Sequence, residues 1–271
     1  MPLLTITSDF GMSDPMVGAV KGEILKVNER FNIIDITHEI EPFNLVQAAF
    51  ICRSFFQNYP LESFHLILVN LYDAPVEHLL LVKHCNQFIG IPDNGLITMI
   101  LDELPHDVVK LPISATPKNH KVCELVNVWI KAFSGIDSGK SIEEIGLKIE
   151  NIVQRSFMKS YITSQYIEGQ ILRIDRFNNI LINITRHEFE QARKGRKFKI
   201  ALLRDTFISN ISSNYSDVEE GEKLARFNES GFLEIAINKG FAGPLFGMGE
   251  FSFSNLNQRH KYYQTIKIYF E

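Results

Sequence analysis

The chain contains 271 residues, of which 45% are hydrophobic and 22% charged, and its formal net charge is −4. These values are typical of a folded, water-soluble protein with one or two domains. No basic face or run of lysine and arginine stands out, which argues against a nucleic-acid partner. The three cysteines are widely spaced and form no Cys-x-x-Cys pair, which argues against a disulfide framework or a zinc ribbon.

No apolar run approaches the length of a membrane-spanning helix, and no signal peptide is apparent. We therefore expect a cytoplasmic protein without a membrane partner. The eight histidines are scattered, and no carboxylate lies at metal-ligand spacing from His78 and His84, which flank a predicted strand, so we expect no metal site.

The first half of the sequence alternates strand-like and helix-like patterns. The predicted strands cover residues 3–7, 32–36, 64–69, 79–83 and 88–91. The predicted helices cover residues 16–27, 45–56, 96–101 and 122–132, and Asn44 is the predicted N-cap of the second. This alternation predicts an α/β domain over residues 1–155, with a mostly parallel sheet flanked by helices.

The second half consists of short strand-like runs separated by turn clusters. The predicted strands cover residues 170–175, 180–184, 198–203, 232–238 and 265–270. Such spacing predicts a smaller, all-β barrel or sandwich domain over residues 165–271.

Two acids, Asp9 and Asp14, directly follow the first predicted strand. Ligands of open α/β sheets bind just beyond the carboxyl ends of the strands, where such acids are well placed to hold a polar small molecule. The structural alternative is that Asp9 shapes a turn and Asp14 caps the next helix.

A second polar cluster, Asp-Arg-Phe-Asn-Asn over residues 175–179, separates two predicted strands. An aromatic ring and amides suit a purine, because they offer a stacking surface and hydrogen bonds for the base edge. Asn-Asn is also an ordinary turn sequence. Tyr215 in a loop and Asn238 at the end of an apolar strand have similar alternatives, as packing and strand-end residues.

These segments together resemble the S-adenosylmethionine hydroxide adenosyltransferase family, whose relatives include chlorinase and fluorinase. Ser-Asp-Phe-Gly-x-x-Asp over residues 8–14 is followed by Val-Gly-x-x-Lys-Gly-x-Ile-Leu over 17–25. The similarity continues through four further segments in matching order, at residues 34–40, 92–96, 174–179 and 231–238.

The resemblance implies an α/β domain followed by a β-barrel domain, which agrees with the pattern above. It also implies a homotrimer that binds a nucleoside ligand between the first domain of one subunit and the second domain of its neighbour. The implied reaction is attack of a water-derived hydroxide on the ribose carbon that bears the sulfonium, which yields adenosine and methionine. S-adenosylmethionine would be the substrate or ligand, and no separate cofactor is expected.

By the same resemblance, Asp9 would bind the ribose hydroxyls and Asp14 would lie near the methionine amino group. Phe43 would pack on the sugar and the sulfonium region. Carboxylates suit these partners, because they accept hydrogen bonds from a diol and from an ammonium group.

In the second domain, Asp175 matches an acid near the methionine end of the ligand. Phe177, Asn179 and Tyr215 would hold the adenine, and Asn238 would bond its edge.

The sequence departs from the family where the hydrolase branch activates water with an Asp, an Arg and a His. Asn70 stands in the Asp position, Glu77 in the Arg position and Lys121 in the His position, with His120 one residue away. An amide cannot accept a proton at neutral pH, and Glu for Arg reverses a charge. The catalytic positions Asn70, Glu77 and His120 are therefore altered. A substitute base could come from one of four nearby residues: Asp73, Glu77, His120 and Glu124.

Three hypotheses remain open at this point. The first is a divergent enzyme that hydrolyses S-adenosylmethionine. The second is a catalytically degenerate protein that binds S-adenosylmethionine or adenosine without cleaving it. The third is a homo-oligomer whose site accepts another nucleoside.

Overall fold

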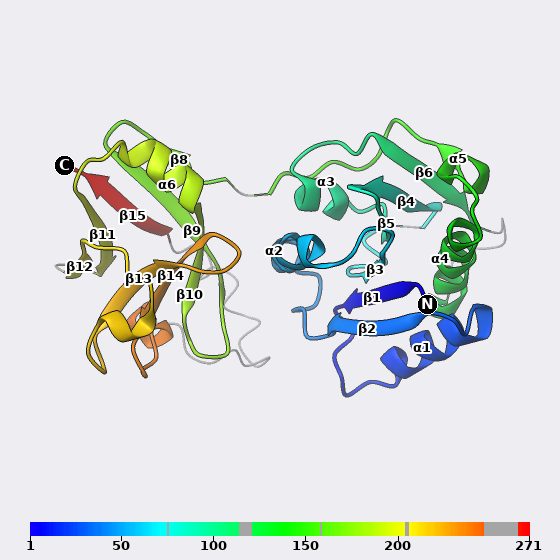
Figure 1. Cartoon of the computed structure of the whole chain (residues 1–271), viewed down its shortest axis with the longest axis horizontal. Helices are drawn as coiled ribbons and strands as arrows, with labels where there is room; N and C mark the ends of the chain where they lie inside the picture. Colours follow the sequence, from blue (N-terminus) through cyan, green and yellow to red (C-terminus); the bar gives the residue numbers. More distant parts are fainter. Residues whose placement is uncertain (75, 114–120, 158, 204–205, 247–264) are drawn as a thin grey trace. The chain divides into compact units, whose positions relative to one another are not determined.

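The computed structural model describes residues 1–74, 76–113, 121–157, 159–203, 206–246 and 265–271. The chain forms two compact units, Met1–Phe157 and Met158–Glu271 (Figure 1).

The first unit is built on a seven-stranded sheet. Its described strands are β1 (Leu3–Ser8), β2 (Asn32–Thr37), β3 (Phe64–Leu68), β4 (His78–His84), β5 (Gln87–Pro92), β6 (Asp107–Pro112) and β7 (Leu147–Lys148). Its described helices are α1 (Met16–Val27), α2 (Leu45–Phe55), the 3₁₀ turn η1 (Phe56–Asn58), α3 (Leu96–Leu101), α4 (Val122–Asp137) and α5 (Ile142–Ile145).

The strands lie in the order β2-β1-β3-β5-β4-β6-β7. The first four are mutually parallel, and β4, β6 and β7 pair antiparallel with their neighbours. The predicted α/β class is therefore confirmed, with a sheet that is mixed beyond β5. A tight hairpin turn at Cys85 and Asn86, both with positive φ, returns β5 beside β3. The carboxyl ends of β1, β3 and β5 consequently meet at one edge of the sheet.

The two faces of this sheet are covered by different helices. Helices α1 and α4 pack on one face, while α2 and α3 contact each other on the opposite face (Figure 1). Asn44 caps α2 as predicted, because its side chain accepts a hydrogen bond from Gln47 N at 3.0 Å. Helix α4 is longer than its predicted range.

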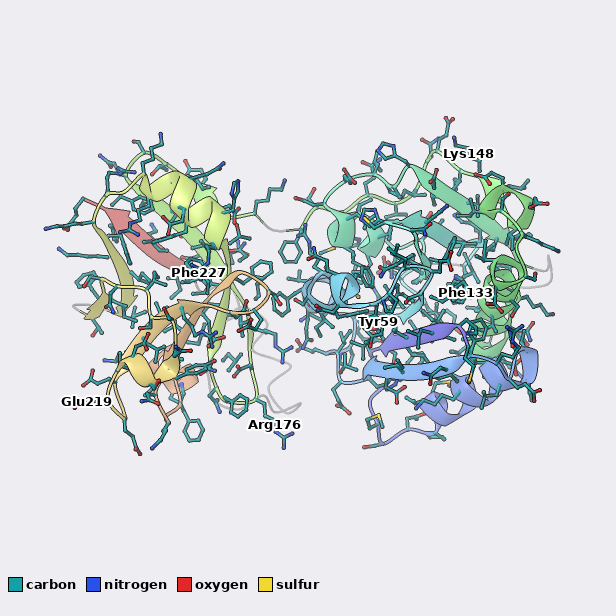
Figure 2. All side chains as sticks on the ribbon, in the orientation of Figure 1. Tyr59, Phe133, Lys148, Arg176, Glu219 and Phe227 are labelled. Carbon is teal, nitrogen blue, oxygen red and sulfur yellow. The ribbon has the colours of Figure 1, made fainter. Side chains whose placement is uncertain are left out.

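Helix α4 fits against the sheet at Gly90 on β5. A Cβ atom at residue 90 would lie 2.7 Å from Trp129 Cδ1 and 2.9 Å from Phe133 Cζ. Both aromatic side chains are fully buried, Phe133 being labelled in Figure 2, and Trp129 Nε1 donates a hydrogen bond to Leu80 O at 2.9 Å. Only a residue without a side chain allows this close approach.

The second unit is an eight-stranded antiparallel sheet. Its described strands are β8 (Tyr161–Ile162), β9 (Tyr166–Ile174), β10 (Ile180–Thr185), β11 (Phe198–Leu203), β12 (Thr206–Ile208), β13 (Lys223–Phe227), β14 (Phe232–Ile237) and β15 (Thr265–Phe270). The main path runs β12-β11-β15-β9-β10-β14-β13, with β8 paired to β9. Because the terminal strands β12 and β13 contact each other, the sheet is a nearly closed barrel, as predicted.

This unit also contains helical segments that the sequence patterns did not predict. They are α6 (Arg186–Arg193) and the 3₁₀ turns η2 (Tyr215–Asp217) and η3 (Gly243–Phe246). Helix α6 begins with a capping box between Thr185 and Glu188. Its Phe189 is fully buried in the core of the barrel.

The packing of α4 predicts the effect of filling residue 90. Gly90→Ala should lower the free energy of unfolding by about 1–3 kcal/mol, because the added methyl group overlaps two buried rings. Urea denaturation measures the change. The matched control is Gly22→Ala in α1, where a Cβ would meet no atom within 4 Å. Alanine at residue 22 should raise stability by about 0.5–1 kcal/mol, and equal effects of the two substitutions would contradict the packing argument.

Candidate functional site

The first cluster of polar side chains lies where β1, β3 and β5 end. Asp9 follows β1, Asn70 follows β3 by two residues, and Asp93 and Asn94 follow β5. The three strands are adjacent and parallel, so these residues share the carboxyl edge of the sheet. This edge is where open α/β sheets bind their ligands.

Asp9 holds two loops in place through one carboxylate oxygen. Its Oδ2 accepts hydrogen bonds from Phe43 N and from Asn70 N, each at 3.1 Å. Both donors have left-handed backbone conformations, with φ of 66° and 48°. These two hydrogen bonds fix the direction of the Asp9 carboxylate. Neither amide bonds its Oδ1.

A buried hydrogen bond supports the residue before Asp9, and a contact extends from its histidine to the exposed Asp35. The Ser8 hydroxyl lies 2.7 Å from His38 Nδ1, and His38 Nε2 lies 3.2 Å from Asp35 Oδ1. Burial tends to raise the pKa of Asp35, but the Lys21 ammonium and the His38 imidazole outweigh it and lower that pKa. These contacts tie the end of β1 to the end of β2.

Other predicted residues of the first unit have clear structural contacts. Gly11 has a φ of 74°, and its N–H donates to His38 O at 2.7 Å, so the glycine in this motif is needed for the turn. Asp14 Oδ1 accepts a hydrogen bond from Met16 N at 2.8 Å, at the first residue of α1. Asp14 therefore bonds the first residue of α1, although the N-cap residue of this helix is Pro15. Phe43 is 70% exposed and presents its ring to solvent in this chain.

The altered catalytic positions differ in their contacts and in their exposure. Asn70 contacts Asp9 through its backbone, and its side-chain Nδ2 donates to Asp73 Oδ1 at 2.9 Å. Glu77 is exposed. His120 lies outside the described residues, and Lys121, the first described residue after it, precedes α4.

The second cluster lies at one edge of the barrel unit. Ile180 at the start of β10 pairs with Ile174 of β9 and Ile235 of β14. The residues that follow β9 and β14, Asp175 and Asn238, therefore come to the same edge as Asn179.

Within this cluster, the Asp175 carboxylate organises the turn. Its Oδ1 accepts from Phe177 N and Asn179 N, both at 2.8 Å, and its Oδ2 accepts from Asn179 Nδ2 at 3.1 Å. Asn179 is consequently buried, whereas Phe177 is 74% exposed. Arg176, labelled in Figure 2, lies at the tip of the same hairpin. Asp175 therefore stabilises the turn, and this turn leaves the Phe177 ring exposed to solvent.

Tyr215 and Asn238 are each held by a defined partner. The Tyr215 hydroxyl donates to Glu234 Oε1 at 2.6 Å, and the Arg226 guanidinium lies 4.8 Å from the centre of the Tyr215 ring. Burial raises the pKa of Glu234, while Tyr215 and Arg226 act in the opposite direction. Asn238 Nδ2 donates to Val218 O at 2.8 Å.

Sequence reasoning missed several residues of these clusters. Ser8 and His38 lie inside matched motifs, but no pattern indicated that they form a hydrogen-bonded pair. Glu234 is a buried carboxylate within an apolar strand, which is a signal for a function or a partner. Arg155, which ion-pairs with Asp73 at 2.7 Å, carries no sequence signal at all.

Two classes of feature are absent from the part of the chain that the structure describes. No group of three or more His, Cys, Asp or Glu side chains is arranged to hold a metal ion there. No helix among the same residues is long and apolar enough to cross a membrane.

Comparison with protein families identifies both units. Residues 4–146 match the S-adenosylmethionine hydroxide adenosyltransferase N-terminal domain, and residues 169–252 match the C-terminal domain of the same family. The chain belongs to this family.

Relatives with curated names are similar over most of the chain. An (R)-S-adenosyl-L-methionine hydrolase from Methanocaldococcus jannaschii is 26% identical over 87% of this chain and 88% of its own length. A hydrolase of the same name from Thermus thermophilus is 24% identical, covering 90% and 94%. A fluorinase from an Actinoplanes species is also 24% identical, covering 90% and 92%.

Solved structures support the fold. An uncharacterised conserved protein from Thermotoga maritima superposes with a TM-score of 0.77 at 23% identity, covering 98% of this chain and 99% of the other.

The geometry of Asp9 predicts how its substitutions differ. Asp9→Asn keeps an acceptor oxygen for the amides of Phe43 and Asn70 but removes the charge. It should weaken adenosine binding by about 10- to 100-fold, since a hydrogen bond to a charged group contributes about 1.5–3 kcal/mol, and it should lower thermal stability less than Asp9→Ala does. Asp9→Ala should weaken binding and also lower stability. Calorimetry and thermal unfolding measure the two effects.

The control is Asp107→Asn at the start of β6. Asp107 pairs with Lys83, which pairs with Phe88 near the start of β5, so it lies at the opposite edge of the sheet from Asp9. Adenosine binding by Asp107→Asn should equal that of the wild type. Wild-type affinity in Asp9→Asn would show that Asp9 does not hold the nucleoside.

Proposed function

We propose that this protein hydrolyses S-adenosylmethionine to adenosine and methionine. Water supplies the oxygen that bonds to the ribose carbon bearing the sulfonium, and it releases one proton to solvent. The carbon–sulfur bond breaks, and its electron pair goes to the sulfur of methionine. Methionine is a neutral leaving group, so the main task of the protein is to align the ribose carbon and the water and to exclude other solvent.

The observation that carries this proposal is the fixed Asp9 carboxylate at the carboxyl edge of the sheet. Two backbone amides orient Oδ2, and the carboxylate as a whole offers further lone pairs to a ribose diol. Membership of the family and the names of the curated relatives agree with this substrate.

The barrel unit supports the same substrate class. The exposed ring of Phe177 offers a stacking surface beside the amide of Asn179, and Tyr215 lies beside the buried Glu234. Aromatic rings with nearby amides suit adenine. We propose that Phe177, Asn179, Tyr215 and Asn238 contact the base, and that Asp14 and Asp175 face the methionine end.

A second candidate function is binding of S-adenosylmethionine or adenosine without cleavage. The observation that favours it is that Asn70 and Glu77 stand where the hydrolase branch has a catalytic Asp and Arg. Asn70 uses its amide as a donor to Asp73, and Glu77 is exposed to solvent. Neither residue reproduces the acid and the arginine of the family.

Release of adenosine distinguishes hydrolysis from binding without cleavage. Purified protein incubated with S-adenosylmethionine should release adenosine and methionine in equal amounts, measured by chromatography against a heat-inactivated sample and the Asp9→Asn variant. The assay should use each sulfonium diastereomer separately, since the names of the relatives specify the (R) form. Saturable binding without adenosine release would instead establish the non-catalytic function.

We also propose that the protein is a homotrimer, with the ligand between the α/β unit of one subunit and the barrel unit of its neighbour. The support is the exposure of Phe43 and Phe177, at 70% and 74%, because large apolar side chains at ligand sites are normally covered. Light scattering should give about three times the chain mass of 31.1 kDa.

Mixed subunits test the shared site directly. Asp9→Asn and Phe177→Ala should each be nearly inactive alone, since one loses the ribose contact and the other a stacking surface. Trimers that contain both variants would regain unaltered sites, because an intact Asp9 and an intact Phe177 come from different subunits. Co-expression should therefore restore adenosine release. Activity no higher than the mean of the two variants would contradict a shared site.

We place the protein in the cytoplasm. All three cysteines, at residues 52, 85 and 123, are free thiols, which suits a reducing compartment.

A further inference from the structure

A polar network extends from Asp9 along the carboxyl edge of the sheet. Asn70 joins two carboxylates, because its backbone N–H donates to Asp9 and its side-chain amide donates to Asp73 Oδ1 at 2.9 Å. The other oxygen of Asp73 forms an ion pair with Arg155 Nη2 at 2.7 Å. Asn70 therefore connects Asp73 with Asp9, the carboxylate that is proposed to hold the ribose.

Arg155 is held firmly although its side chain is 46% exposed. Its Nε donates to Asn94 O at 2.9 Å, and its backbone N–H donates to the Thr98 hydroxyl at 2.9 Å. Its aliphatic stem packs against Gly95, where a Cβ would lie 2.5 Å from Arg155 Cγ. The guanidinium is consequently oriented toward Asp73 by the turn that follows β5.

Asn94 connects this turn back to Asn70. Its side-chain Nδ2 donates to Val69 O at 2.9 Å and to Asn70 O at 3.1 Å. The backbone and the side chain of Asn70 are thus both bonded, and Asn70 presents its amide to Asp73 in one orientation.

The neighbouring carboxylates are occupied by structural contacts. Asp93 accepts from Val153 N at 2.8 Å, and its second oxygen lies 3.0 Å from His78 Nε2, with the side chain only 12% exposed. Glu124 accepts from Lys121 N at 3.2 Å in the capping box of α4.

Asp73 combines acceptor capacity with exposure to solvent, whereas Asp93 is largely covered. Among the described residues, each oxygen of Asp73 receives one hydrogen-bond donor, so by the usual count of about four lone-pair positions the carboxylate retains capacity for a water molecule or a proton. Its side chain is also 33% exposed.

The loop that carries Asp73 also lies against the beginning of α4. Leu71 belongs to the buried cluster against which the partly buried Val122 packs. Burial raises the pKa of Tyr72, and the negative charge of Glu124 raises it further. Residues 70–73 thus lie between the Asp9 carboxylate and the first turn of α4.

We propose that Asp73 is the general base of the hydrolysis and that Asn70 and Arg155 are its positioning residues. This inference rests on the proposed function. The water oxygen bonds to the ribose carbon, the carbon–sulfur bond breaks toward sulfur, and the water proton passes to an Asp73 oxygen and then to solvent. A carboxylate can accept that proton, whereas the amide of Asn70 cannot.

Kinetics of Asp73→Asn test the assignment. The variant keeps the size of the side chain and one acceptor oxygen, so its fold and its adenosine affinity should match the wild type. Its kcat should fall by about 10²- to 10⁴-fold, the usual contribution of a general base, with KM changed less than about threefold. A matched control is Glu168→Gln, which removes an ion-paired carboxylate of the barrel unit whose side chain is 24% exposed, and which should leave kcat unchanged.

Two further readouts separate a catalytic role from a structural one. Formate added to Asp73→Ala should restore part of kcat, because a free carboxylate replaces the missing base, whereas chloride at equal ionic strength should not. Arg155→Gln should lower kcat by about tenfold without changing KM, and Arg155→Lys should retain more of the wild-type rate because it keeps the positive charge.

The outcomes distinguish this inference from the proposed function. Absence of adenosine release by the wild-type protein overturns both. Release by the wild type together with an undiminished kcat in Asp73→Asn overturns only the role of Asp73. A decrease in kcat that formate does not restore, accompanied by lower thermal stability, assigns Asp73 to the structure rather than to the reaction.

Discussion

The site of the first unit depends on one carboxylate oxygen, Asp9 Oδ2. It joins the end of β1 to the loops after β2 and β3 by accepting the amides of Phe43 and Asn70. Left-handed conformations at such residues cost of the order of 1–3 kcal/mol each, and hydrogen bonds to a charged acceptor contribute a similar amount in the opposite direction. The loops that frame the edge of the sheet therefore depend on the acceptor oxygen of Asp9. Because the same group is proposed to hold the ribose, the residue that shapes the site would also bind its ligand.

The fold class could be predicted from the sequence because its signals are local. Apolar runs that alternate with helical periodicity predicted the α/β unit, and short strands between turn clusters predicted the barrel. Helix α6 was missed because only Phe189 and Ala192 of its eight residues are buried, which leaves almost no apolar stripe. The Thr185–Glu188 capping box was the available signal. The antiparallel insertion of β4 beside β5 depends on a two-residue hairpin turn and on long-range pairing, which local patterns do not encode.

The residues of the candidate site could also be predicted only in part from the sequence. The order of the motifs along the chain predicted that Asp9 and Phe177 belong to one ligand site, although they lie in different units. The structure adds the contacts that orient each of them. Arg155 could not be predicted, since it meets Asp73 across 82 residues of sequence and belongs to no motif. Its position follows from the turn after β5, where Gly95 leaves room for the arginine stem. Sequence patterns therefore identified the groups that would hold a nucleoside, whereas the arrangement of charges beside them required the three-dimensional structure.

The most direct test of this account is a crystal structure of the protein with adenosine. We predict that the ribose hydroxyls lie within hydrogen-bond distance of the Asp9 carboxylate, at about 2.5–2.7 Å, with the amides of Phe43 and Asn70 still bonded to Oδ2. The ribose carbon that would bear the sulfonium should face Asp73. A nucleoside bound away from Asp9, or an Asp9 carboxylate rotated out of its contacts with the two loops, would contradict the account.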